Sequence, residues 1–173
     1  MLLCVFVWLI GSHLDLMPSL WNSLGSGASW RRVIVTGFIS AMILLVVTVV
    51  TGALAGGKFG FHPYFPKMAG DLVSNMYEEI VYRGLMFCSF YGVAAGECFP
   101  LNGNLNRAGI VVGTIGSCLV FALGHEQYSA ALRVVIGAVA IVFVYPWIKT
   151  RSLWAPWITH TLGDIIGDTI IKL

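Results

Sequence analysis

MYEEIVYRG, residues 76–84, places two adjacent carboxylates and one arginine inside an apolar run. The run begins near Leu72 and continues beyond Leu85. Ionisable side chains are costly in a segment long enough to cross a bilayer, so they mark a candidate functional site. Partners for Glu78, Glu79 and Arg83 must then come from other apolar segments of the chain.

The composition predicts a membrane protein. Of the 173 residues, 58% are hydrophobic and 10% are charged, whereas a soluble domain has roughly 25% charged residues. No block of lysines and arginines indicates a surface for nucleic acid, so we expect no nucleic-acid partner. The four cysteines form no C-x-x-C pair and are interpreted as small hydrophobic residues.

The apolar segments predict an all-α, polytopic transmembrane helix bundle, a multi-pass integral membrane protein surrounded by lipid. About five spans are expected, over residues 33–56, 69–94, 107–127, 130–148 and 153–171. Residues 1–10 are apolar but too short to span, so we expect a partial N-terminal span from a truncated helix. Residues 1–32 would form this start and an interfacial loop, and residues 33–173 the bundle.

Glycine pairs with small-xxx-small spacing favour close packing of these helices. The pairs are Gly92/Gly96, Gly109/Gly113 and Gly163/Gly167.

Ionisable residues lie on three of the expected spans. They are Glu78, Glu79, Arg83, His125, Glu126, His160, Asp164 and Asp168. Residues four apart share a helix face, so Glu79 can pair with Arg83. Glu78 is rotated by about 100° and stays free for another role. Two histidines and this spare carboxylate can converge on one water or one metal ion.

Three ordered motifs carry a family resemblance. Glu-Glu-x-x-x-Arg at Glu78–Arg83, Phe-x-x-x-His at Phe121–His125 and His-x-x-x-Asp at His160–Asp164 follow one another on successive spans. This arrangement resembles the CAAX protease and bacteriocin-processing family of intramembrane endopeptidases, which includes the type II CAAX prenyl endopeptidases. The resemblance covers roughly residues 69–171, the expected catalytic core.

The resemblance implies a role for each matched residue. Glu78 corresponds to the catalytic carboxylate, which with His125 would activate a water to attack a peptide carbonyl. Glu79 and Arg83 would form a supporting ion pair. The substrate would be a membrane-associated peptide or protein, either prenylated or unmodified. Burial and neighbouring charge can give two adjacent carboxylates such different roles.

His160 and Asp164 would complete the site, either as metal ligands or as stabilisers of the developing oxyanion. Many relatives carry asparagine where this chain has Asp164, and an ionised aspartate cannot donate a hydrogen bond to an oxyanion. Asp164 is therefore better suited to bind a metal or to orient His160. In a metal-dependent reaction the cofactor would be one divalent ion, with zinc as the first candidate. In a glutamate-type reaction there would be no cofactor. The expected metal ligands are Glu78, His125, His160 and Asp164.

One geometric feature opposes this interpretation. In a simple up-and-down bundle His125 and His160 would lie at different depths, so convergence requires irregular helices, with Gly124 and Pro156 as candidates. The alternative is a non-enzymatic membrane protein. It could be a proton- or ion-coupled transporter, since these also bury carboxylates and histidines, or it could be an immunity-type scaffold. The sequence shows no inverted repeat of the kind found in many transporters.

Overall fold

The computed structural model describes residues 9–11, 13–15, 18, 20–25, 28–54, 56 and 58–172, and most of these are helical. The helices are α2 (Leu20–Gly25), α3 (Trp30–Leu54), α4 (Phe65–Glu79), the π-helix η1 (Ile80–Phe87), α5 (Cys88–Ala95), α6 (Arg107–Leu123), α7 (Ala130–Val139), α8 (Ile141–Thr150) and α9 (Trp154–Ile170). Two short strands, β1 (Lys58–Phe59) and β2 (Ile171–Lys172), pair in antiparallel orientation. The expected all-α fold is confirmed.

Five helical stretches correspond to the five expected spans. The elements α4, η1 and α5 follow one another without a gap, and only Ala140 separates α7 from α8. Trp30–Leu54 and Ala130–Thr150 are long and apolar enough to cross a membrane, whereas Arg107–Leu123 is apolar but shorter. The count of five membrane spans therefore stays a prediction. Most of the partial span expected at residues 1–10 lies outside the described residues.

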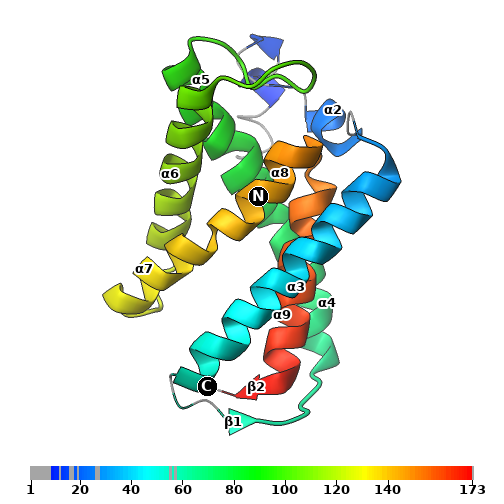
Figure 1. The fold of residues 1–173 in the computed structure, drawn as a ribbon, viewed down its shortest axis with the longest axis vertical. Coiled ribbons are helices and arrows are strands. Elements are labelled where there is room, and N and C mark those ends of the chain that lie inside the picture. Colours follow the sequence, from blue (N-terminus) through cyan, green and yellow to red (C-terminus); the bar gives the residue numbers. More distant parts are fainter. Residues whose placement is uncertain are drawn as a thin grey trace.

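Helix α3 packs along α9, and α5 packs along α6 (Figure 1). Small residues allow the first contact, since a Cβ on Gly37 would lie 2.8 Å from the Ala155 carbonyl oxygen, and Gly163 faces Leu44. Similarly, Gly109 packs against Tyr91, and Gly113 packs against Phe87.

Two of the three glycine pairs thus serve helix packing, as expected. A Cβ on Gly92 would have one ordinary contact, with the Glu97 carbonyl oxygen at 3.6 Å, and one on Gly96 would meet nothing within 4 Å. Gly96 instead ends α5 with a positive φ of 70°.

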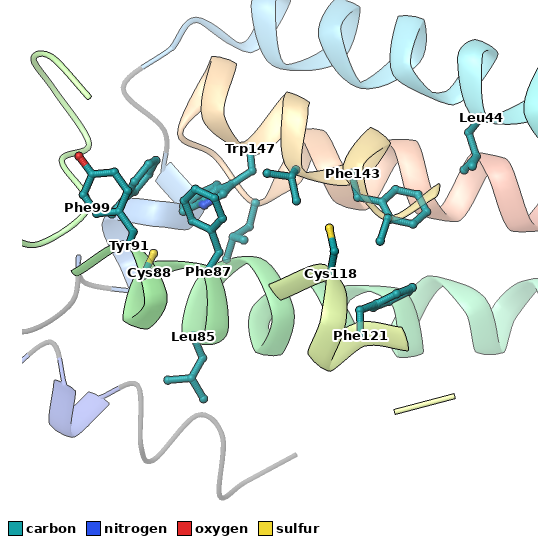
Figure 2. Close-up of a cluster of buried hydrophobic side chains, with 13 residues drawn as sticks. Leu44, Leu85, Phe87, Cys88, Tyr91, Phe99, Cys118, Phe121, Phe143 and Trp147 are labelled. Atoms are coloured by element: carbon teal, nitrogen blue, oxygen red, sulfur yellow. The ribbon is translucent and has the colours of Figure 1, made fainter. Parts of the chain in front are cut away.

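An aromatic core fills one end of the bundle (Figure 2). Phe99, from the loop after α5, stacks on Trp147 with ring centroids 5.2 Å apart. It also packs edge-on against Phe87 and Tyr91. The Tyr91 hydroxyl accepts a hydrogen bond from the backbone N–H of Asn106 at 2.8 Å. The loop between α5 and α6 is therefore anchored, which fixes how these two helices meet.

The α3–α9 contact should be sensitive to one methyl group. Gly37→Ala would push a Cβ against a backbone carbonyl that cannot move aside, and overpacking of this kind costs about 1–3 kcal/mol. We expect a lower apparent Tm of the detergent-solubilised protein, measured by size-exclusion chromatography after heating. Gly70→Ala in α4 is the matched control, since nothing lies within 4 Å of its added Cβ. An equal Tm for both variants would contradict the close approach of α3 and α9.

Candidate active site

Polar side chains recur every four residues on the facing sides of α4 and α9. The two rows, here called the polar seam, are Lys67, Asp71, Asn75 and Glu79 on α4 and His160, Asp164 and Asp168 on α9. The rows pair in antiparallel order. Lys67 forms an ion pair with Asp168, Asn75 donates to Asp164 at 2.9 Å, and His160 meets Glu79 at 2.8 Å. A four-residue spacing on both helices produces this register.

Glu79 and Arg83 form a fully buried ion pair at the inner end of the seam. Arg83 Nη1 lies 3.3 Å from Glu79 Oε1, and the side chains are 1% and 0% exposed. The guanidinium carbon lies 4.7 Å from the Phe121 ring centroid and 4.8 Å from that of Phe143. Arg83 Nη2 also donates to the Ala140 carbonyl at 3.4 Å, at the junction of α7 and α8. The pair predicted from the i,i+4 spacing therefore exists, and it ties four helices together.

A π-helix begins immediately after Glu79. Its i→i+5 hydrogen bonds widen the turn, and such segments often occur at functional sites. The widened segment includes Arg83 and Gly84, both buried. The apolar run over residues 69–94 predicts a single span, and within this span the helix type changes at the motif.

His160 lies among three carboxylates. Its Nδ1 is 2.8 Å from Glu79 Oε1, and its Nε2 is 3.5 Å from Asp164 Oδ2 and 3.9 Å from Glu78 Oε2. The ring stacks on Phe143 at 4.4 Å. An ionised carboxylate only accepts hydrogen bonds, so Nδ1 donates to Glu79. The tautomer is thereby fixed, and Nε2 faces the other two carboxylates.

Glu78 has a different environment from its neighbour. Its side chain is 28% exposed, whereas that of Glu79 is fully buried. Glu78 lines a cavity of about 400 Å³ together with His125, His160 and Asp164. The cavity brings together α4, the turn after α6, and α9. The side chains expected on three different spans therefore do meet at one place.

The end of α6 determines where His125 lies. The helix ends at Leu123 and Gly124 caps it, so His125 lies in the following turn. A Cβ on Gly124 would come within 2.4 Å of the Tyr82 hydroxyl, which explains a glycine here. His125 Nδ1 donates to the Phe121 carbonyl at 2.7 Å, and the two rings lie 4.5 Å apart. In a neutral ring this leaves the Nε2 lone pair free.

The irregularity expected at Gly124 is thus present. The prediction of an irregularity at Pro156 is wrong. Pro156 lies in the first turn of an unbroken α9, where a proline is tolerated because its missing N–H would have no partner.

Three polar residues of the site were missed from the sequence. Lys67 precedes the expected span over residues 69–94, but α4 begins at Phe65 and includes it. Asp71 accepts from Lys67 at 3.3 Å, and Asn75 binds Asp164. Their spacing by four from Glu79 was the available signal. Asp168, which lies outside the three motifs, lines the cavity as well.

The expected ligand set does not fit a metal ion in this arrangement. Metal ligands lie about 2 Å from zinc, and three or four of them surround it. Among the described residues, no three His, Cys, Asp or Glu side chains are grouped so that they could hold a metal ion. A metal bound by Glu78, His125, His160 and Asp164 stays a prediction. We assign no chemical step to it.

Comparison with known proteins identifies the family. Residues 40–166 match the family model described as Type II CAAX prenyl endopeptidase Rce1-like. No curated protein and no solved structure matches the chain. The matched segment contains all three motifs and most of the bundle, which confirms the resemblance drawn from the sequence. The chain therefore belongs to the Rce1-like type II CAAX prenyl endopeptidases, a family of membrane-embedded proteases.

Proposed function

We propose that this protein is a multi-pass intramembrane endopeptidase in which Glu78 is the general base. One observation carries the proposal: two adjacent glutamates have separate environments. Glu79 is fully buried between Arg83 and His160. Glu78 is partly exposed and lines the cavity, with His160 Nε2 at 3.9 Å, beyond hydrogen-bond distance. One carboxylate is thereby committed to structure, and the other is available to bind water.

The reaction requires a water between Glu78 and the scissile carbonyl. Glu78 accepts a proton from this water as its oxygen attacks the carbonyl carbon. His125, whose Nε2 is free, holds the water from the other side. When the carbon–nitrogen bond of the tetrahedral intermediate breaks, Glu78 returns the proton to the leaving amine. The products are a carboxylic acid and an amine, and no other reactant is consumed.

The oxyanion of this intermediate needs a hydrogen-bond donor. His160 is suited to the role, because Nδ1 is bound to Glu79 and Nε2 points toward Glu78 and Asp164. A ring with hydrogen on both nitrogens would donate from Nε2 into the cavity. Glu79 and Arg83 act on the reaction only by holding His160 in place.

Apolar side chains from α3 and α7 in the cavity lining support a lipid-modified substrate. They include Leu44, Leu132, Val135, Ile136 and Val139, beside the polar Thr48 and Thr51 of α3. Apolar side chains beside a carboxylate and two histidines suit a peptide whose neighbouring residue carries an alkyl or prenyl chain. We therefore propose a prenylated peptide as the preferred substrate.

Removing the base should abolish cleavage without unfolding the protein. Glu78→Gln keeps the size of the side chain and should lower kcat at least about 100-fold. The Tm should stay at the wild-type value because Glu78 is partly exposed. The control is Glu126→Gln in the exposed turn after α6, which should keep wild-type activity.

The assay uses proteoliposomes with a fluorogenic peptide that ends in a farnesylated cysteine and three further residues. The same peptide without the farnesyl group is the second substrate, and it should be cleaved more slowly. Full activity of Glu78→Gln would contradict the proposed base. Equal cleavage of the two peptides would contradict only the role of the lipid.

The buried ion pair should control stability. Arg83→Met removes the cation paired with the buried Glu79 and leaves only the His160 hydrogen bond, and breaking a buried ion pair costs about 3–5 kcal/mol. We expect a large drop in apparent Tm, measured in detergent. Arg107→Met at the exposed start of α6 should leave the Tm unchanged. Equal Tm values for the two variants would show that the pair does not hold the bundle together.

A glutamate-type reaction has a consequence for metal content. The expected ligands line one cavity, but among the described residues no three of them are grouped closely enough to hold a metal ion. The purified protein should therefore hold well under one zinc per chain by mass spectrometry. Cleavage should also survive a chelator such as 1,10-phenanthroline. Stoichiometric zinc that disappears in His160→Ala would instead assign the site to a metal, with Glu78, His125 and Asp164 as the other ligands.

A further inference from the structure

Asn75 is a buried polar residue that no step of the proposed reaction uses. It lies on α4 and is 3% exposed. Its Nδ2 donates to Asp164 Oδ2 at 2.9 Å, across the interface with α9. On the other side of the amide, the Ser74 hydroxyl approaches Asn75 Oδ1 at 3.5 Å. Since a carboxylate accepts only, the NH₂ group must face Asp164.

Asp164 is the less constrained partner. Its side chain is 38% exposed, and the same oxygen that binds Asn75 lies 3.5 Å from His160 Nε2. That distance is too long for a good hydrogen bond, so the histidine alone does not fix the carboxylate. Without the Asn75 amide, rotation about χ1 would let Asp164 turn toward the open part of the cavity.

The contacts therefore form one chain from Asn75 to the proposed oxyanion donor. Asn75 holds Asp164, Asp164 faces His160 Nε2, and Nε2 is the atom directed toward the cavity beside Glu78. Hydrogen-bond partners that orient metal-binding side chains contribute about 10- to 100-fold to activity, and we expect an effect of the same size for a group that orients the neighbour of the proposed oxyanion donor.

We infer that Asn75 is a positioning residue, which fixes the Asp164 carboxylate beside His160 and so sets the charge environment of Nε2. The inference rests on the proposed endopeptidase function. The competing explanation is that Asn75 merely joins α4 to α9, in which case its loss would affect stability alone.

Three variants separate the two explanations. Asn75→Leu keeps the branched shape and the number of heavy atoms but has no donor, and Asn75→Asp replaces the donor with an acceptor that repels Asp164. Both should lower kcat about 10- to 100-fold, with KM within about threefold of wild type. Ser74→Ala is the matched control, since it removes a long contact on the other side of the same amide. It should retain wild-type kcat.

A rescue tests the pairing itself. In the double variant Asn75→Asp with Asp164→Asn, the donor and acceptor are exchanged and the hydrogen bond can form again. Asn75→Asp should therefore cost at least about tenfold in kcat in the wild-type background, but less than about threefold in the Asp164→Asn background, a coupling that adjacent residues show. Equal effects in the two backgrounds would overturn the inference, as would a lowered Tm with unchanged kcat in Asn75→Leu.

A measurement without substrate keeps this test separate from the proposed function. Nitrogen-15 chemical shifts of the histidine side chains report the hydrogen bonding of each ring nitrogen. The His160 Nε2 shift should move in Asn75→Leu and Asn75→Asp, and should stay in place in Ser74→Ala. An unmoved shift in both folded Asn75 variants would overturn the positioning role. Failure of the wild type to cleave either peptide would contradict the endopeptidase function alone.

Discussion

The buried pair of Glu79 and Arg83 is the interaction on which the rest of the structure depends. A guanidinium without a partner in an apolar interior would be prohibitively costly. Here it is held by a carboxylate, by two aromatic rings, and by a backbone carbonyl at the α7–α8 junction. These contacts come from different helices. The charge therefore fixes where α6, α7 and α8 meet the helix that carries the motif.

Pairing with the Arg83 guanidinium also gives the two adjacent glutamates different roles. Glu79 points inward to Arg83 and His160, and the helix rotation of about 100° then turns Glu78 toward the cavity. The same turn of helix thus supplies a structural anchor and a group that can accept a proton. The pairing also fixes His160, because its Nδ1 shares the Glu79 oxygen that Arg83 approaches. A stabilising ion pair and a positioned histidine are therefore one assembly.

The polar seam connects this assembly with the outside of the bundle. Side-chain exposure rises along α9 from His160 at 7% to Asp164 at 38% and Asp168 at 51%. Hydrolysis in a membrane needs water at the site, and a graded row of polar groups provides hydrogen-bond partners for it. Apolar side chains from α3 and α7 line the same cavity. In the proposed reaction, the cavity thus offers both polar partners for water and apolar contacts for the substrate.

Local rules explain what the sequence by itself determined. Apolar length predicted the helices, and a spacing of four residues predicted the Glu79–Arg83 pair, because both depend on helix geometry alone. The motifs also contain Glu78, His125, His160 and Asp164, which line the cavity. Tertiary structure decided the rest: the π-helix after Glu79, the turn that brings His125 to the cavity, and the register that places Asn75 opposite Asp164. These features depend on contacts between residues up to 89 positions apart, which no local pattern contains.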